Sequence, residues 1–229
     1  MAVFTAQDVK ANVRVRDGKR VFYLAEGDVL TPSARDWLQS DNVEILSAAQ
    51  AKPKFYRTEE GRRITEKPEH MTHLKPDVLV PKEHPRIVFR GLLDALQAEI
   101  LLCGSQVQGQ LRRDMAELLA ATRQIMRCDV LEEPWTEKPI CGLTPEELRA
   151  HSHFPQKYYD QPHFMPDFDD SPILLQLNRL RTMVRQTELA ACRAFSQRKD
   201  LIQVLNRLSS LVWILMIRLK KESGHEANT

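Results

Sequence analysis

Residues 201–219 have the sequence LIQVLNRLSSLVWILMIRL, and this stretch decides the fold class. As a helix it is apolar around nearly its whole circumference, which is typical of a helix buried within a bundle or against another subunit. Its most apolar part, 208–219, is interrupted by Ser209, Ser210 and Arg218 and is too short for a membrane span. We therefore expect the Asn206 side chain to have a hydrogen-bond partner in the protein or in a ligand. The one polar face of this predicted helix carries Asn206, Ser209, Ser210 and Trp213.

Helical spacing of apolar residues continues outward from this stretch and predicts four long helices. One begins at Pro85, a second covers about 106–129, and two close the chain at about 172–196 and 199–221. The connections are short except for an irregular crossover at 130–171, which contains a short helix at Thr144-Pro145-Glu146-Glu147. This arrangement predicts a mainly α, four- or five-helix bundle over 85–221.

The first 84 residues differ from the rest of the chain. Residues 1–50 predict a small α+β appendage of unknown role, with strands at 20–23 and 43–46 and a helix capped by Thr31. Residues 51–84 are rich in Pro, Lys and Glu without a sustained period, and we expect them to be an irregular loop region. Residues 222–229 are expected to form a disordered tail.

Bulk composition restricts the classes of function. The chain has 229 residues, 42% of them hydrophobic, and a net charge of only +2. We therefore expect neither a nucleic acid nor a membrane as partner. The four cysteines show no CxxC spacing, and the N-terminus lacks the pattern of a secretory signal, so a cytoplasmic protein is expected.

Charged residues border the predicted core of the helix at 172–196. Arg181, Arg185 and Glu188 follow one another at i, i+4 and i+7, beside an apolar stripe. Guanidinium groups bordering a core need carboxylates or phosphates as partners. Asp94, within GLLDALQAEILL, raises the same question. The spacing alone is also compatible with an exposed ladder of charges.

Three segments together resemble motifs of the ATP:cob(I)alamin adenosyltransferases of the propanediol-utilisation type. That family has helices with G-x-x-D-E-L-N-S, A-R-T-V-C-R-R-A-E and L-N-R-L-S-D. Here the matching segments are GLLDALQA at 91–98, LRTMVRQTE at 180–188 and LNRLSS at 205–210. The phrases TPSARDWL, KPEHMTHL and VPKEHPRI are more similar to the ethanolamine-utilisation branch. The resemblance covers about 67–221 and implies a ferritin-like up-down bundle that assembles as a homotrimer.

The resemblance also implies a reaction. Co(I) of a reduced corrinoid (cobalamin), supplied with electrons by a reductase, attacks the 5′ carbon of ATP, and triphosphate departs. Arg181 and Arg185 would hold the polyphosphate, because a planar fork suits phosphate oxygens. Asp94 would pair with Arg181, within the chain or across the family's subunit interface. Glu188 and Asn206 fall on family positions near the nucleotide and its Mg²⁺.

The chain departs from the family at the nucleotide loop. The usual T-G-D-x-G-x-T is absent, and KPEHMTHL stands in its place. Lys67, Thr72 and His73 are the candidates there for contacts to adenine and ribose, and Lys82 aligns with a family lysine that serves the phosphates.

The family also uses a phenylalanine before the arginine helix to crowd the lower face of cobalt. Phe164 is the candidate for this role here, and Phe168 is the alternate. For both phenylalanines, a structural role in the hydrophobic core is the alternative.

Seven histidines raise the question of a metal. Some ethanolamine-type relatives carry a His followed by Cys-Cys-x-x-Cys, but here Lys82 and Glu83 lie at the corresponding distance from His70. We therefore expect no transition metal. Two other functions stay open: a non-catalytic module of an ethanolamine microcompartment, and a His-rich metalloenzyme on a helical bundle.

Overall fold

The computed structural model describes residues 1–16, 18–51 and 55–226, with side chains up to residue 223. Contacts divide the chain into two compact units. The first comprises residues 1–84 together with 127–133, and the second comprises 85–126 together with the chain from 134 onward. Residues 127–133, placed in the bundle by the sequence, thus group with the first unit.

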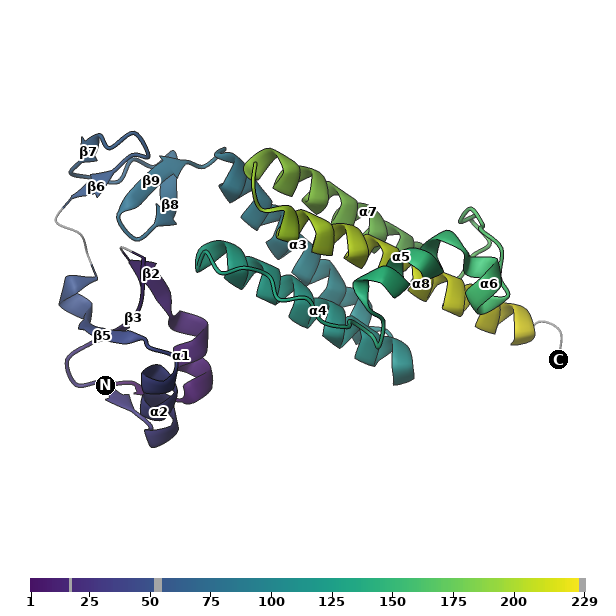
Figure 1. Ribbon diagram of the computed structural model, residues 1–229, viewed down its shortest axis with the longest axis horizontal. Coiled ribbons are helices and arrows are strands. Elements are labelled where there is room, and N and C mark those ends of the chain that lie inside the picture. Colours follow the sequence, from purple (N-terminus) through teal and green to yellow (C-terminus); the bar gives the residue numbers. More distant parts are fainter. Residues whose placement is uncertain (17, 52–54, 227–229) are drawn as a thin grey trace. The chain divides into compact units, whose positions relative to one another are not determined.

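Four long helices build the second unit (Figure 1): α3 (Pro85–Ser105), α4 (Gly109–Val130), α7 (Pro172–Ala194) and α8 (Lys199–Glu226). Helix α7 packs against both α3 and α8. The predicted mainly α bundle with a small N-terminal α+β part is confirmed, and the four helix positions agree within a few residues.

Helix α7 begins where its capping chemistry is favourable. The Ser171 hydroxyl accepts a hydrogen bond from the backbone N–H of Leu174, and Pro172 occupies the first turn, where its missing N–H costs nothing. Its buried residues recur at helical spacing and include Leu177, Leu180 and Val184, all fully buried. This stripe fixes which face of α7 points into the bundle, and therefore which face carries Arg181 and Arg185.

Helix α8 is the central apolar element that residues 201–219 predicted. It is longer than that apolar run, and Lys199–Ser223 is long and apolar enough to cross a membrane by length and composition alone. Its apolar side chains, however, are buried against α7 and the short helices α5 (Pro145–His153) and α6 (Pro155–Tyr159). We therefore assign α8 to the core of the bundle. The expected disordered tail is wrong for residues 222–226, which continue α8, and residues 227–229 lie outside the described residues.

The crossover between α4 and α7 is less irregular than expected. Helix α5 begins at a reciprocal capping box, in which the Thr144 hydroxyl accepts from the N–H of Glu147 and the Glu147 carboxylate accepts from the N–H of Thr144. Helix α6 was not predicted. It spans only five residues and begins without a side-chain cap, so its local signal is weak.

The first unit is built from short strands and two helices. Residues 1–50 hold β1 (Val3–Phe4), α1 (Ala6–Asn12), β2 (Arg14–Arg16), β3 (Lys19–Leu24), β4 (Val29–Leu30), α2 (Pro32–Ser40) and β5 (Glu44–Ser47), followed by one 3₁₀ turn at Ala48–Gln50. Strand β3 pairs with β2 antiparallel and with β5 parallel, and β1 pairs with β4. The two predicted strands and the Thr31 cap are confirmed. Leu131 joins a small core whose other buried members are Val9, Val13, Phe22, Leu30, Ala34, Leu38 and Val43.

The expectation that 51–84 is irregular is wrong for the residues that the structure describes there. They form a four-stranded sheet of order β7-β6-β9-β8, with β6 (Tyr56–Arg57), β7 (Arg63–Ile64), β8 (Met71–Lys75) and β9 (Val78–Pro81). Two of these strands have only two residues, which is too short for a period to show in the sequence. Their pairing, rather than their own propensity, creates the sheet.

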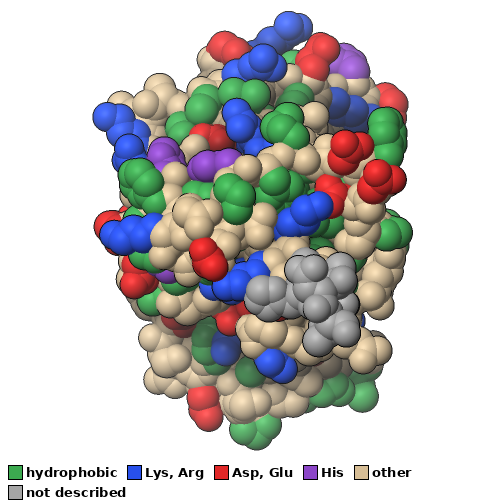
Figure 2. Space-filling model, turned by 90° about the vertical axis from the view of Figure 1, so that its right-hand side faces the viewer, with side chains coloured by type: hydrophobic (Ala, Val, Ile, Leu, Met, Phe, Trp, Pro, Cys, Tyr) green, Lys and Arg blue, Asp and Glu red, His purple; other side chains and the backbone are tan. Residues whose placement is uncertain are grey.

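Charges of both signs are mixed on the surface. Figure 2 shows one face of the molecule, on which basic and acidic side chains are interspersed with apolar ones and histidines. The described residues on this face show no extended patch of one sign.

Candidate active site

A polar pocket of about 480 Å³ lies in the bundle, between α7, α8 and the crossover. Helices α7 and α8 supply most of its wall, and the end of α5 and the segment after α6 supply the rest. Its lining residues are Ser152, His153, His163, Arg181, Arg185, Glu188, Leu189, Asn206, Ser209, Ser210 and Trp213.

The pocket exists because two helices turn their polar stripes toward each other. On α7, Arg181, Arg185 and Glu188 share one side at i, i+4 and i+7. On α8, Asn206 and Trp213 stand two turns apart. The structure thus brings together four residues that the sequence singled out: Arg181, Arg185, Glu188 and Asn206.

Arg181 is half-buried and lacks a carboxylate partner among the described residues. Its Nη2 donates to the side-chain oxygen of Asn178 at 3.2 Å, and its buried Nε has no hydrogen-bond partner. Burial lowers the pKa of Arg181, and the nearby positive charge of Arg185 lowers it further. Two neighbouring guanidinium groups without a counter-charge would be relieved by an anion in the pocket.

Glu188 and Asn206 connect the two helices across the pocket. The Asn206 amide donates to one Glu188 carboxylate oxygen at 3.0 Å, and Arg207 donates to the Asn206 carbonyl oxygen at 2.7 Å. The partner expected for Asn206 is therefore a protein group. The second Glu188 oxygen accepts no hydrogen bond from the described residues, so it is available to a ligand or a cation.

Aromatic rings close one side of the pocket. Trp213 stacks with His163, at 5.9 Å between ring centroids, and with Phe164 at 4.9 Å. The structure thus places Phe164 directly beside the pocket. Phe168, the alternate, is 98% exposed, and no contact among the described residues connects its ring to the pocket.

Asp94 lies on α3 with its side chain exposed. Among the described residues it forms no ion pair, so the expected pair with Arg181 does not form within the chain. The buried acid of α3 is instead Glu99, whose Oε2 lies 3.2 Å from Nη2 of Arg179. A pair between Asp94 and Arg181 across a subunit interface stays a prediction.

Four further candidates belong to the first unit. Thr72 and His73 are adjacent on β8, so their side chains point to opposite faces of the sheet. His73 packs edge-on against Tyr56, and burial together with the Lys67 charge lowers its pKa. Lys67 is exposed. A nucleotide role for any of these residues stays a prediction.

Lys82 follows β9, and its ammonium group forms an ion pair with Glu69 at 3.0 Å. The pair lowers the pKa of the Glu69 carboxyl. A phosphate that bound Lys82 would have to compete with this carboxylate, which is itself almost fully exposed.

Sequence reasoning missed some of the pocket. His153 and His163 are two of the seven histidines, for which the sequence predicts no role in this pocket, and Ser152 and Leu189 give no signal in the sequence. Ser209, Ser210 and Trp213 were recognised as the polar face of their helix without being assigned to a site. The signal that could have found them is this polar face on an otherwise apolar helix.

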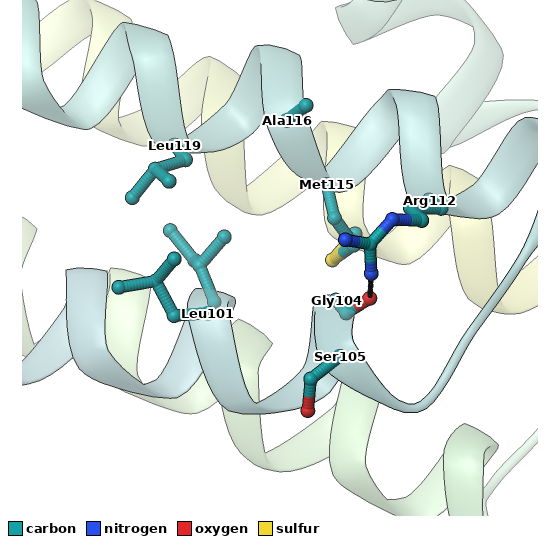
Figure 3. Close-up of a pocket in the computed structure, with 8 residues that line it drawn as sticks. Leu101, Gly104, Ser105, Arg112, Met115, Ala116 and Leu119 are labelled. Carbon is teal, nitrogen blue, oxygen red and sulfur yellow. Dashed lines mark hydrogen bonds between the residues drawn. The ribbon is translucent and has the colours of Figure 1, made fainter.

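A second hollow, of about 300 Å³, lies between α3 and α4 (Figure 3). Leu101, Met115 and Leu119 give it an apolar wall. Its one charged side chain, Arg112, donates to the backbone carbonyl of Gly104. This hollow lacks a group of unpaired cations, so it does not suit a polyphosphate.

The described residues show no group of three or more His, Cys, Asp or Glu side chains that could hold a metal ion. The histidines of the crossover are engaged otherwise. His151 contacts the Tyr159 hydroxyl at 2.8 Å, and His163 lies 3.2 Å from the His153 carbonyl oxygen. That the protein has no resident transition metal stays a prediction.

Fold and pocket together define a class: a helical-bundle protein with two arginines and an aromatic wall in one pocket. A family model described as cobalamin adenosyltransferase matches residues 64–219. Since this match covers more than half of the chain, the protein belongs to the cobalamin adenosyltransferase family.

Curated relatives support the same assignment. The chain is 30% identical over 238 residues to the corrinoid adenosyltransferase EutT of Escherichia coli K12, covering 91% of this chain and 89% of the relative. The same values hold for EutT of Salmonella typhimurium LT2. Because 91% of the chain is covered, the match includes most of the N-terminal unit.

A solved structure has a similar fold. It is a variant of the PduO-type ATP:corrinoid adenosyltransferase from Lactobacillus reuteri, complexed with cobalamin and ATP. The TM-score is 0.52 at 16% identity, and the match covers 68% of this chain and 91% of that one. At this identity the comparison establishes the fold alone.

Proposed function

We propose that this protein transfers the 5′-deoxyadenosyl group of ATP to Co(I) of a reduced corrinoid and releases triphosphate. Family membership supports the class of reaction. The observation that carries the proposal for this chain is Arg181, a half-buried guanidinium with no carboxylate partner among the described residues, next to Arg185 in a pocket of about 480 Å³. Such a site is built to receive a polyanion.

The two arginines would act on the leaving group. In the proposed reaction the C5′–O bond of ATP breaks, and the electron pair of that bond departs with triphosphate. Negative charge therefore grows on the oxygen that leaves. Arg181 and Arg185 can stabilise this charge from α7, where a packed helix holds them in position before the reaction begins. The protein needs no nucleophile of its own.

Glu188 and Asn206 would hold the Mg²⁺ that accompanies ATP. The Asn206 amide orients the Glu188 carboxylate at 3.0 Å and leaves the second carboxylate oxygen available. Oxygen ligands from one or two carboxylates, completed by phosphate oxygens and waters, are typical of Mg²⁺ sites in nucleotide enzymes. The donor set therefore fits the cation.

Phe164 would face the corrinoid. Its ring lies beside Trp213 at the edge of the pocket, and its half-buried position leaves part of the ring accessible. In that position the Phe164 ring would exclude water and other ligands from one face of the bound corrinoid, which would make Co(II) easier to reduce.

The exposed Asp94 supports a site that a second subunit completes. A homotrimer, as in the family, would let Asp94 of one chain pair with Arg181 of its neighbour. Lys67, Thr72, His73 and Lys82 would then contribute to nucleotide binding from the first unit.

The cellular setting is part of the same proposal. The similarity to EutT supports a role in bacterial ethanolamine utilisation, in the cytoplasm or a microcompartment. The conversion of cob(II)alamin to cob(I)alamin consumes one electron, and a reductase is the proposed source of that electron. Microcompartment components are proposed as further partners.

An anaerobic assay tests the function. Purified protein, Mg·ATP and chemically reduced cobalamin should show loss of Co(I) absorbance and the appearance of photolabile adenosylcobalamin. Arg181→Ala should abolish turnover, whereas Arg193→Ala, an exposed arginine of the same helix outside the pocket, should not. Wild-type protein that shows no turnover with any corrinoid would contradict the proposal.

A further inference from the structure

Trp213 occupies a central position in the pocket. It lies on α8, is half-buried, and contacts groups from two other segments of the chain. The Arg181 guanidinium of α7 lies 5.6 Å from its ring centroid. The rings of His163 and Phe164, from the crossover, stack on it with interplanar angles of 8° and 28°.

The contact with Arg181 substitutes for a missing counter-charge. In the part of the chain that the structure describes, the Arg181 Nε has no hydrogen-bond partner, and the positive charge of Arg185 repels the Arg181 guanidinium. Indole is the strongest of the aromatic side chains in attracting a cation over its face. Trp213 therefore holds the guanidinium in place without neutralising its charge, which stays available to an anion.

The contact with Phe164 fixes the crossover. Residues 161–167 have no regular secondary structure, so their position depends on side-chain contacts. Lys220 of α8 provides a second anchor, since its ammonium group lies 5.7 Å from the Phe164 ring centroid and pairs with the buried Asp170. Trp213 is the anchor that touches both this segment and the arginine helix.

We propose that Trp213 is a positioning residue, which sets Arg181 and Phe164 relative to each other. The positions of the ATP polyphosphate and of the corrinoid ring would then both depend on the Trp213 side chain. This inference rests on the proposed function for its two substrates, whereas the contact between Trp213 and Arg181 does not depend on it. Removing the flat ring should weaken the use of both substrates at once.

The kinetic experiment compares three variants. Trp213→Leu removes the aromatic face, and Trp213→Phe keeps a stacking ring. Trp37→Leu is the matched control, because Arg20 lies 5.6 Å from the Trp37 ring in the other unit. We expect Trp213→Leu to lower kcat/KM about tenfold for both ATP and corrinoid. Trp213→Phe should recover most of this loss, and Trp37→Leu should leave both values within about twofold of wild type.

Two results would overturn the inference. One is a Trp213→Leu protein with wild-type kinetics for both substrates. The other is a Trp213→Phe protein as impaired as Trp213→Leu, because a stacking role must be rescued by a second aromatic ring. Thermal unfolding of each variant separates these outcomes from a general loss of stability.

A binding experiment works without turnover. The chain has three tryptophans, so Trp37→Phe combined with Trp135→Phe leaves Trp213 as the single tryptophan fluorophore. Titration with inorganic triphosphate should change its fluorescence saturably, and Arg181→Met should abolish the change. A saturable change in a protein without adenosyltransferase activity would refute the proposed function but keep the coupling between Trp213 and Arg181. If triphosphate binds, as shown by calorimetry, but leaves the fluorescence unchanged, the coupling is wrong.

Discussion

At the scale of single residues, the chemistry of the site depends on what is left unpaired. Some charged groups in the bundle form ion pairs, as Arg179 does with Glu99 and Lys220 does with Asp170. Among the described residues, neither Arg181 nor Arg185 forms an ion pair. An unpaired and partly desolvated cation costs stability, and it is retained where a ligand supplies the counter-charge.

Arg181→Lys tests whether the planar guanidinium matters beyond its charge. Lysine keeps the positive charge but loses the forked geometry and the extended contact with Trp213. We expect kcat/KM for ATP to fall about 10- to 100-fold, equivalent to one or two hydrogen bonds to a charged group. Steady-state kinetics under anaerobic conditions measure the change, with Arg193→Lys as control. Equal activity of Arg181→Lys and wild type would show that only the charge is used.

Phe164→Ala and Phe168→Ala form a matched pair. Phe164 stacks on Trp213, whereas Phe168 is 98% exposed. Phe164→Ala should slow adenosylation that starts from cob(II)alamin and a reductant at least tenfold, because the reduction step loses its apolar lower face. It should slow the reaction of chemically prepared cob(I)alamin much less. Phe168→Ala should match wild type in both assays, and the reverse pattern would transfer the role to Phe168.

At the scale of elements, the start of α8 connects the crossover to the bundle. The Asp200 carboxylate accepts hydrogen bonds from Arg198 and from the backbone N–H of Trp135, each at 2.9 Å. Burial alone would raise the pKa of Asp200. The hydrogen bonds from Arg198, Trp135 and Leu201 outweigh it and lower the pKa from 3.8 to about 2.

Asp200→Asn should therefore show a pH-dependent loss of stability. A carboxyl group with a lowered pKa stabilises the fold fully above its unfolded value near 4, and the stabilisation disappears as pH falls through about 2. At pH 7 we expect Asp200→Asn to lower the free energy of unfolding by about 1–2 kcal/mol. Urea denaturation at pH 7 and at points between pH 4 and 2 should show this difference shrinking. The exposed Asp36→Asn serves as control, and a difference that is constant with pH would contradict the assignment.

At the scale of the whole molecule, each of the two units carries a different part of the candidate binding residues. The bundle holds the arginines, the Glu188–Asn206 pair and the aromatic wall. The first unit carries the candidates that would replace the family's nucleotide loop, and the match to the curated relatives covers 91% of this chain. Because candidate residues lie in both units, the effect of a cofactor should be measured as the activity of the full-length protein.

Removal of transition metals should leave the activity intact. No cluster of metal-binding side chains is found in the parts of the chain that the structure describes, and the thiolates of the ethanolamine-type motif are missing. Protein treated with a strong chelator and then supplied with Mg·ATP should retain its kcat. Omission of Mg²⁺ should abolish turnover. A requirement for added zinc or iron would show that the histidines bind a metal in the active protein.

The sequence by itself determined the class of fold and which charged residues share one side of a helix. Apolar spacing in 85–221 predicts long helices because helix formation and burial of one face are local properties of the pattern. The same logic placed Arg181, Arg185 and Glu188 on one side of α7. Strands of two residues, as in β6 and β7, carry too little pattern to be predicted, and they were missed.

Only the tertiary structure decided which residues meet. It placed Asn206 against Glu188, aligned Trp213 with both Arg181 and Phe164, and left Asp94 exposed. These contacts join positions between about 18 and 50 residues apart in sequence, so no local period encodes them. They follow from the packing of α7 on α8 and from the path of the crossover. Both are determined by tertiary packing of the core, not by local sequence.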